Sequence, residues 1–363
     1  MKILMICPFP PPVTGESFLA ERFERVLQAH GHQVKRLNLA SEQLNSGGFR
    51  WRRLFQMLSL AWHAAISARL ADRVYFFPAE SALGNFRDFV LYSAMWMNLQ
   101  KVVVHLHGGS GFAKILKAQP RRVLNRWFLK RTKCLIVEGA FAANIFSQYC
   151  PGIRINVVSN YAPSEYRRRD VLPRVAQCAV EGEFRVVFLG NMIEGKGWRD
   201  LVLGYFLLPL DIRRRTVVHF IGSYNNVDAG VEVSKFATES NGRLVFHGPL
   251  VGVEKEEILI HAHVLCLPTY YEFEGQPMAI LEGYAAGCVI VATQHAGIPD
   301  VFQDGVNGIA VESRSPESIA RALSALNERV DNLSAISERN LALARSEFSE
   351  EIVSNRITKI LLD

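Results

Sequence analysis

Two glutamates eight residues apart, Glu274 and Glu282, are the side chains of this sequence best suited to chemistry. Glu274 stands just before a loop glycine, whereas Glu282 falls inside the apolar helical run MAILEGYAAG and should be buried. A buried carboxylate is costly unless it is paired. Two hydroxyls of a sugar or a ribose would supply that partner, and so would the terminus of a neighbouring helix.

Histidines form the second group of candidates. His107 ends a strand-like run, KVVVHLH, immediately before two glycines, and His105 alternates with apolar residues and is interpreted as a buried structural side chain. Two others, His261 and His263, flank a helix-to-strand junction at a spacing that would suit a metal ion. The sequence offers them no third and fourth ligand, so we predict no metal site.

Strand-like and helix-like runs alternate along the whole chain, and they must position these side chains. Six strand-like runs lie in the first half, at residues 2–7, 34–39, 73–78, 101–107, 134–139 and 154–160. Six more lie in the second half, at residues 184–190, 216–222, 243–248, 264–269, 289–293 and 308–312. This alternation favours parallel sheets covered by helices on both faces. We therefore predict two Rossmann-like, doubly wound α/β domains, followed by C-terminal helices.

A stretch rich in proline and charge divides the two series. We predict an N-terminal domain at residues 1–165, a linker at 166–183 and a C-terminal domain at 184–345. A terminal helix at 346–363 should pack back toward the first domain. Ligands of doubly wound sheets bind beyond the carboxyl ends of the strands, so we expect the site in a central cleft between the two domains.

The length and composition agree with two folded domains. The 363 residues exceed one ordinary core, and 49% hydrophobic with 21% charged residues is the balance of a globular protein. The longest apolar stretch, residues 54–66, is interrupted by polar residues and is too short to span a bilayer. Six scattered cysteines with no CxxC pair disfavour a disulfide scaffold or structural zinc, and they favour a reduced, cytoplasmic compartment.

Charge is divided unevenly between the halves. Residues 1–170 hold 24 Lys and Arg against 10 Asp and Glu, a net charge of +14, whereas residues 171–363 hold 17 against 25, a net charge of −8. Opposite charges suggest that the halves meet different partners. The basic half should face nucleic acid, anionic lipid headgroups or a phosphorylated substrate. No recognised nucleic-acid module is present, so we do not expect nucleic acid.

Several other chemistries lack their motifs. The sequence has no DxD triplet, which would serve as a metal–diphosphate clamp, and no GxGxxG after the first strand of either half. It also has neither a GxxxxGK[ST] loop nor a GxSxG elbow. Nicotinamide chemistry, ordinary nucleotide hydrolysis and serine hydrolase chemistry are therefore unsupported.

The segment EGQPMAILE, residues 274–282, resembles the E-x7-E motif of the retaining glycosyltransferases of family 4, the glycosyl transferases group 1. Matching features follow at residues 286–287, 289–293, 296–300 and 304–308. The resemblance covers most of the chain and is strongest from about residue 184 to 312. It implies the GT-B fold and a nucleoside-diphosphate sugar as donor, with no cofactor and no metal.

This resemblance assigns roles to the acidic segment. Glu274 would bind hydroxyls of the donor sugar, and Glu282 would bind the ribose of the nucleotide. Backbone N–H groups of Gly297 and Ile298, at the start of a helix, would lie near the diphosphate, where unpaired N–H groups suit an anion. The other expected nucleotide-sugar-binding residues of this segment are Gly275, Gln276 and Pro277.

Two further matches lie outside that segment. In FLGNMIEGKGWRDL (188–201), Lys196 and the next glycine match the family pattern G-R-x4-K-G, whose Arg and Lys hold the leaving diphosphate. Asn191 replaces the Arg, so Lys196 becomes the main cation. In the first half, Thr14 and Gly15 stand where the family often has a glycine pair. His107 stands where family members commonly have a histidine near the donor sugar.

Two basic, aromatic segments suggest a membrane surface. Residues 50–53 open an apolar helical run that extends to residue 62, and residues 121–133 mix six Lys and Arg with Trp127 and Phe128. Such segments suit anionic lipid, although an ordinary helix with its apolar stripe on the core has the same pattern. Family 4 holds the acceptor on its first domain, and many bacterial members extend lipid-linked sugars.

We therefore predict a retaining, metal-independent glycosyltransferase. It would move a sugar from a nucleoside diphosphate to a hydroxyl of a growing, lipid-linked glycan during the biosynthesis of a cell-surface polysaccharide. It would be cytoplasmic and peripheral at the inner face of the cell membrane, with His107, Lys196 and Glu274 as catalytic residues. The alternatives are a nucleotide-sugar epimerase of the same shape and a non-catalytic, membrane-associated glycan-binding protein.

Overall fold

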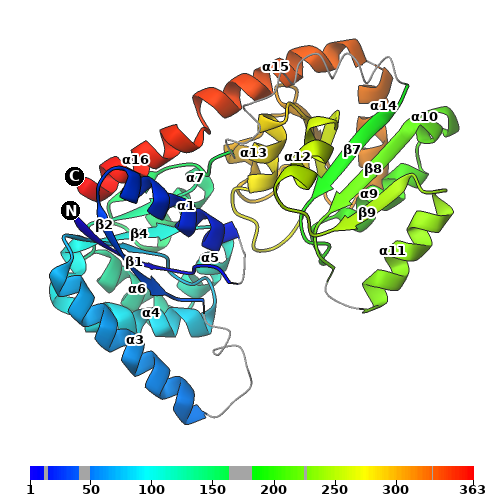
Figure 1. The fold of residues 1–363 in the computed structure, drawn as a ribbon. Helices are drawn as coiled ribbons and strands as arrows, with labels where there is room; N and C mark the ends of the chain where they lie inside the picture. The colour runs from blue at the N-terminus through cyan, green and yellow to red at the C-terminus, as the bar shows by residue number, and fades with distance from the viewer. Residues whose placement is uncertain (12–14, 41–49, 163–181, 225–226, 329) are drawn as a thin grey trace. The chain divides into compact units, whose positions relative to one another are not determined.

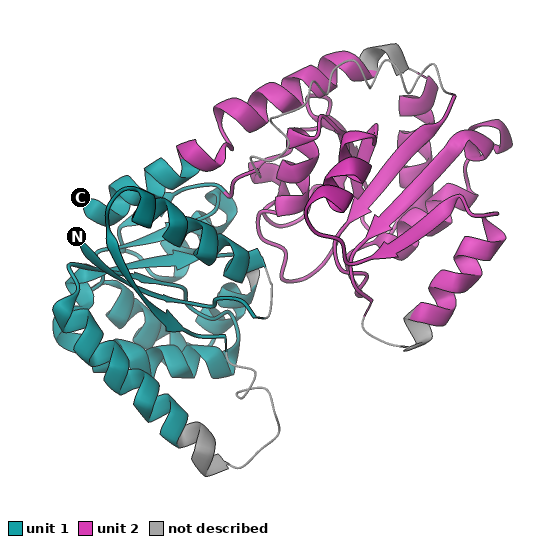
Figure 2. Cartoon of the chain, in the orientation of Figure 1, with its two compact units in different colours: residues 1–159, 353–363 teal, residues 160–352 magenta. Residues whose placement is uncertain are grey.

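The computed structural model describes residues 1–11, 15–40, 50–162, 182–224, 227–328 and 330–363. The chain forms two compact units, shown in Figure 2: unit 1 contains Met1–Ser159 and Val353–Asp363, and unit 2 contains Asn160–Ile352. Residue Thr14 and most of the predicted linker lie outside the described residues. No helix in the described ranges is both long and apolar enough to cross a membrane.

Unit 1 is built on a six-stranded parallel sheet in the order β2-β1-β3-β4-β5-β6. This is the flavodoxin-like order, in which the connections reverse direction between β1 and β3. Buried runs of β-branched and aliphatic residues explain the central strands, because a sheet covered on both faces needs apolar residues on each. The strands are β1 (Lys2–Cys7), β2 (Gln33–Asn38), β3 (Arg73–Phe76), β4 (Val102–Leu106), β5 (Cys134–Val137) and β6 (Ile155–Val157).

Helices lie on both faces of this sheet (Figure 1). The first, α1 (Gly15–Ala29), buries Leu19, Phe23 and Leu27, which recur every four residues and so share one face. The turn after the helix contains Gly31, whose φ of +79° favours glycine. The others in this unit are α3 (Arg50–Leu70), α4 (Ala82–Ala94), the 3₁₀ helix η1 (Trp96–Lys101), α5 (Ser110–Lys117), α6 (Gln119–Leu129) and α7 (Ala140–Tyr149).

Unit 2 is built on a second six-stranded parallel sheet in the order β12-β11-β10-β7-β8-β9. Its connections reverse direction between β7 and β10, as in a Rossmann fold. The strands are β7 (Phe184–Leu189), β8 (Thr216–Ile221), β9 (Leu244–Gly248), β10 (Val264–Leu267), β11 (Val289–Thr293) and β12 (Gly308–Val311). Its helices are α9 (Trp198–Phe206), α10 (Leu210–Arg215), α11 (Val227–Glu239), α12 (Val253–Ile260), α13 (Met278–Ala285), the 3₁₀ turn η3 (Ile298–Asp300), α14 (Pro316–Glu328) and α15 (Val330–Ser346).

The predicted fold class is confirmed, since every strand-like run of the sequence contains a strand in the structure. Each sheet lies at the centre of its own hydrophobic core. The last helix, α16 (Glu350–Leu362), returns the chain to unit 1 at Val353. There Arg73 donates hydrogen bonds to the carbonyl oxygens of Leu361 and Leu362, at 2.9 and 3.1 Å, and so satisfies groups that a helix end leaves open.

Candidate active site

The topology of unit 2 brings two predicted site residues together. Strands β7 and β10 are neighbours at the point where the connections reverse, and their carboxyl ends lie at the same edge of the sheet. Lys196 comes from the loop after β7, and Glu274 comes from the loop after β10. Residues far apart in sequence therefore meet where doubly wound sheets bind their ligands.

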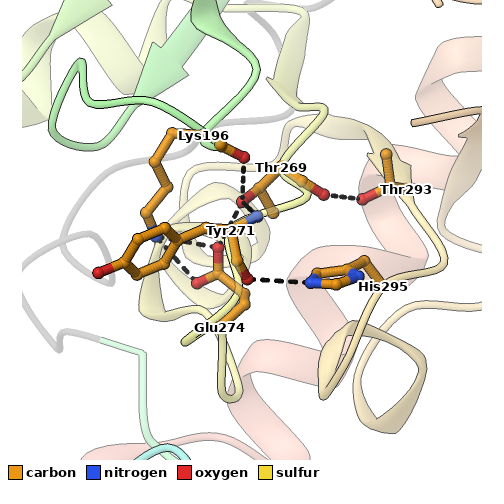
Figure 3. Close-up of polar contacts among 7 residues, drawn as sticks. Lys196, Thr269, Tyr271, Glu274, Thr293 and His295 are labelled. Carbon is orange, nitrogen blue, oxygen red and sulfur yellow. Dashed lines mark hydrogen bonds and ion pairs between the residues drawn. The ribbon is translucent and has the colours of Figure 1, made fainter. Parts of the chain in front are cut away.

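Lys196 and Glu274 form a bidentate ion pair, drawn in Figure 3. Lys196 Nζ lies 3.0 Å from Oε1 and 2.9 Å from Oε2 of Glu274. The two side chains are 19% and 6% exposed, so water screens the pair only in part. Lys196 Nζ also lies 5.0 Å from the centre of the Tyr271 ring, within the range of a cation–π contact.

A glycine makes this approach possible. Gly197 precedes α9 with φ of +75°, and a Cβ atom built there would lie 2.2 Å from the carbonyl oxygen of Pro268. Any larger residue would clash with backbone at the end of β10. The two loops are also joined by a hydrogen bond from the Tyr270 N–H to the Gly195 carbonyl, at 2.6 Å. The small size of Gly197 thus allows Lys196 to approach the loop that carries Glu274.

Three residues that the sequence did not suggest hold Glu274 and its loop. The Thr269 hydroxyl donates to Glu274 Oε2 at 2.7 Å, and the Thr293 hydroxyl donates to the Thr269 carbonyl. His295 Nε2 lies 2.9 Å from the carbonyl oxygen of Tyr271, in the same loop as Glu274, and Figure 3 shows these contacts together. Threonines at strand ends carry no distinctive sequence signal. Because these hydrogen bonds hold Glu274 and its loop, its carboxylate is oriented before any ligand binds.

Glu282 lies on α13 and is 8% exposed, so the predicted burial is confirmed. Its Oε2 receives an ion pair from Lys255 on α12. The sequence suggested sugar hydroxyls or a helix terminus as the partner of Glu282, and it did not suggest Lys255. Nothing in the sequence around Lys255 indicates this ion pair. A carboxylate has about four lone-pair positions, so this ion pair leaves acceptor capacity for a ribose.

The loop around Gly297 was predicted to bind the diphosphate through backbone N–H groups. A Cβ atom at Gly297 would lie 2.6 Å from the Gly275 carbonyl oxygen, so these two loops are in close contact. The predicted helix after Gly297 is only the three-residue turn η3, and the Ile298 N–H donates to the His295 carbonyl at 3.0 Å. A single turn has little dipole, so the expected anion site there is weaker than a helix N-terminus would provide.

Gln276 is engaged with the backbone. Its Oε1 accepts a hydrogen bond from the Asn160 N–H at 2.6 Å, and its carbonyl accepts one from Asn160 Nδ2 at 3.1 Å. Pro277 caps α13 and fixes where that helix begins. These residues shape the loop that carries Glu274 and connect it to the start of unit 2.

Asn191, in the place of the family arginine, is exposed at the end of β7. Its Oδ1 accepts hydrogen bonds from the Ser223 N–H at 3.3 Å and the Ser223 hydroxyl at 2.8 Å. The oxygen of the amide is thereby fixed toward Ser223. The Nδ2 hydrogens are left as the donors of this side chain, and an anion is a suitable acceptor for them.

Unit 1 places His107 at the end of β4, with Nδ1 2.8 Å from Oε1 of Glu138. Glu138 is a residue that sequence reasoning missed, although its place just after the neighbouring strand could have indicated it. His105 is buried beside His107 and contacts the Tyr75 hydroxyl, and burial holds its pKa well below the ordinary value. Gly15 begins α1, and a Cβ atom built there would meet no atom of the described residues within 4 Å.

Further carboxyls lie near this edge of the first sheet. Burial raises the pKa of Glu80 to about 7, and the charges of Glu16 and Glu138 act in the same direction. Burial also raises the pKa of Glu16, while His107 lowers it. The unit is basic in total, yet the carboxyl ends of its central strands are acidic.

Unit 1 also exposes aromatic and aliphatic side chains. On α3, Phe55 and Trp62 are 69% and 67% exposed, and Leu58 and Ile66 lie on the same face. On α6, Trp127 stacks on Trp96 with ring centres 4.7 Å apart, and Arg131 lies 4.0 Å from the centre of the Trp127 ring. The apolar residues of these helices are therefore not all turned to the core.

The chain is similar to known glycosyltransferases. Residues 183–329 match the family model of glycosyl transferases group 1. Over 253 residues the chain is 22% identical to an uncharacterized glycosyltransferase, MJ1069, of Methanocaldococcus jannaschii, in an alignment that covers 66% of this chain. It is 21% identical to the amylovoran biosynthesis glycosyltransferase AmsK of Erwinia amylovora, over 72% of this chain. The alignments span 62% and 63% of those relatives' own lengths.

Solved structures support the same fold. HepE of Anabaena, in complex with UDP, matches with a TM-score of 0.76 and 16% identity, and the match covers 99% of each chain. The matched family segment contains Lys196, Glu274 and Glu282. The predicted resemblance is confirmed: residues 183–329 match the glycosyl transferases group 1 model, the chain is similar in sequence to glycosyltransferases, and its fold has the GT-B architecture.

Proposed function

We propose that this protein transfers a sugar, with retention of configuration, from a nucleoside diphosphate to a hydroxyl of a glycan. The observation that carries the proposal is the ion pair between Lys196 and Glu274, inside the segment that matches the family and at the reversal point of the second sheet. The family assigns these two positions to the diphosphate and to the donor sugar. A cation and a carboxylate in contact suit the junction of those two groups.

The chemistry proposed is a front-face displacement. The bond between the anomeric carbon and the diphosphate oxygen breaks, and the oxygen of the incoming hydroxyl forms a new bond to the anomeric carbon on the same face. The leaving diphosphate accepts the proton of that hydroxyl. Lys196, Asn191 and the backbone at Gly297 stabilise the charge that develops on the diphosphate. Glu274 orients the sugar through its hydroxyls, and Glu282 holds the ribose. No metal takes part in this proposal.

Similar proteins suggest which donor and acceptor to test first. HepE is described in complex with UDP and with UDP-glucose, which supports a UDP-sugar as the first donor to test. The name of AmsK refers to the biosynthesis of amylovoran, which supports a role in polysaccharide biosynthesis. A lipid-linked glycan at the cytoplasmic face of the membrane is the acceptor that we propose.

We also propose that unit 1 docks on anionic lipid through α3 and α6. The exposed apolar residues of both helices, together with the basic residues of α6, support this proposal. Exposed apolar patches on a soluble unit mark interaction sites, and a Lys or Arg near an anionic surface contributes about 1 kcal/mol. The side chains of residues 50–54 lie outside the described part of the chain.

A donor panel tests the proposed activity. The purified protein is mixed with UDP- and GDP-sugars, with EDTA present, and thermal stabilisation and release of free nucleoside diphosphate are measured with and without glycan acceptors. Acceptor-dependent release with product of retained anomeric configuration is the expected result. Conversion of the donor without any acceptor would instead identify an epimerase. Sugar-nucleotide binding with no turnover across the panel would favour a non-catalytic glycan-binding protein.

A further inference from the structure

The carboxylate of Glu138 accepts two hydrogen bonds from the segment that carries His107. His107 Nδ1 lies 2.8 Å from Oε1, and the Gly108 N–H lies 3.1 Å from Oε2. The side chains of His107 and Glu138 are 8% and 5% exposed, so this contact is enclosed by protein. A carboxylate oxygen accepts hydrogen bonds, so Nδ1–H of His107 is the natural donor in this contact.

The register of the sheet explains why the two residues meet. Strands β4 and β5 are parallel neighbours, and Leu106 is paired with Val137 at their carboxyl ends. His107 and Glu138 are the next residue of each strand, so they occupy equivalent positions at the edge of the sheet. A buried carboxylate is costly to place there unless it is paired.

The second ring nitrogen of His107 is left unused. Nε2 is buried and has no hydrogen-bond partner among the residues that the structure describes. The ring is held between aromatic neighbours, with ring centres 4.3 Å from Phe77 and 4.2 Å from His105. A neutral imidazole with its proton on Nδ1 has a lone pair on Nε2, and a buried acceptor without a partner indicates a function.

We propose that Glu138 is a positioning residue for His107 in sugar transfer. It holds the imidazole as the Nδ1–H tautomer, so that Nε2 accepts a hydrogen bond from a hydroxyl of the sugar substrate. A protonated His107, or the Nε2–H tautomer, would donate to the hydroxyl oxygen instead and could not accept the hydroxyl hydrogen. This inference rests on the proposed function for its substrate, but the tautomer can be measured on the protein alone.

Two variants of Glu138 separate its role as a hydrogen-bond acceptor for His107 from the space that its side chain fills. In Glu138→Gln the amide has one accepting oxygen for two donors, Nδ1–H and the Gly108 N–H, so one of the two bonds is lost. Glu138→Asp keeps both accepting oxygens and the charge on a shorter side chain. The matched control is Glu24→Gln, because Glu24 is 2% exposed and is paired with Arg36 in the same unit.

The first measurement is nitrogen NMR of the histidine rings at pH 8, with the His107 signals identified by their absence in His107→Gln. The parent should show Nδ1 protonated and Nε2 unprotonated. Glu138→Gln should lose this preference, and Glu138→Asp and Glu24→Gln should keep it. An Nε2–H tautomer in the parent would overturn the proposal, and so would an unchanged tautomer in Glu138→Gln.

The second measurement is steady-state transfer by the same proteins. Glu138→Gln should lower kcat about 10-fold or more, the scale seen when a carboxylate that orients a histidine is lost, with nucleotide affinity unchanged. Glu138→Asp should recover part of the rate. Parent-like kcat in Glu138→Gln would overturn the positioning role. If the tautomers behave as expected but the parent turns over no donor, the proposed function fails and the role of Glu138 in sugar transfer fails with it.

Discussion

Lys196 and Glu274 neutralise each other across the carboxyl ends of β7 and β10, with both Nζ–O distances at or below 3.0 Å. Each is expected to hold a different part of the donor, Lys196 the diphosphate and Glu274 the sugar. Pairing keeps both charged groups stable while the site is empty, because a buried charge without a partner is costly. In the proposed mechanism, Lys196 also contacts the diphosphate and Glu274 also accepts hydrogen bonds from the sugar hydroxyls when the donor binds.

Removal of the cation should damage catalysis more than binding. Lys196→Ala should lower the transfer rate roughly 10²-fold or more, the scale of losing one preorganised charge-stabilising contact. The matched control is Lys235→Ala, because Lys235 is an exposed lysine of unit 2 in a weak surface pair. Initial rates at saturating donor are the measurement. A Lys196→Ala protein that works at the parental rate would remove Lys196 from the mechanism.

The same substitution should affect stability through Glu274. Lys196→Ala leaves a carboxylate that is 6% exposed without its cation, so its melting temperature should fall. Adding Glu274→Gln should restore part of the melting temperature but none of the activity. Equal melting temperatures of the parent and Lys196→Ala would mean that the pair contributes nothing to the fold.

The two glutamates should separate nucleotide binding from transfer. Glu282→Gln should weaken binding of the free nucleoside diphosphate, because a neutral amide is a poorer acceptor for two ribose hydroxyls. Glu274→Gln should bind the nucleotide like the parent and transfer poorly. Calorimetry with the free diphosphate measures both. Parental affinity in Glu282→Gln would show that Lys255, and not a ribose, is the purpose of this carboxylate.

Asn191 offers a gain-of-function test. Asn191→Arg restores the charge of the family pattern at an exposed position, so it should leave the enzyme active and tighten diphosphate binding. Asn191→Ala is the control that removes the amide donors without adding charge, and it should weaken binding. Complete inactivity of a folded Asn191→Arg protein would mean that this loop does not face the diphosphate.

The raised pKa of Glu80 predicts a dependence of stability on pH. An unfolded glutamate ionises near pH 4.3, whereas burial raises the folded pKa of Glu80 to about 7. Between these values the folded state keeps a proton that the unfolded state has lost, so the contribution of Glu80 to the free energy of unfolding falls as pH rises and levels off above about pH 7.

Glu80→Gln removes the ionisable group, and with it the fall in the free energy of unfolding between about pH 4 and pH 7. It should match the parent near pH 4 and be more stable at pH 8, by on the order of 1–3 kcal/mol. Glu21→Gln, at a surface ion pair on α1, is the control and should show no such difference between the two pH values. Melting temperatures at both pH values are the measurement. A constant offset between Glu80→Gln and the parent would contradict the prediction.

Binding to lipid should depend on charge. The protein should sediment with vesicles that contain anionic lipid at low salt and should be released as salt rises, because the Debye length shrinks to about 3 Å at 1 M. Replacing Arg121, Arg122 and Arg126 on α6 with Glu should abolish this and leave nucleotide binding intact. The control changes the net charge equally in unit 2, at Lys235, Arg321 and Arg345. Equal binding to neutral and anionic vesicles would exclude the electrostatic mechanism.

Much of the fold could be predicted from the sequence by itself. All twelve strand-like runs contain strands, because a parallel sheet covered on both faces demands continuous apolar runs that are visible locally. The acidic motif and the Lys196-Gly197 pair were equally visible. Each is a short pattern of neighbouring residues that can be read from a local stretch of sequence. The start of α13 at Met278 was also indicated, by the apolar helical run MAILEGYAAG.

The partners of those residues were decided only by the tertiary structure. The order of the strands, which brings Lys196 to Glu274 and places Glu138 beside His107, depends on pairings between segments far apart in the chain. Lys255 reaches Glu282 from a different helix, and Thr269 and Thr293 act through strand ends that only the sheet aligns. Local patterns determine elements because they reflect local backbone and burial preferences. Which side chains meet depends on how distant elements pack, and no short window of sequence contains that information.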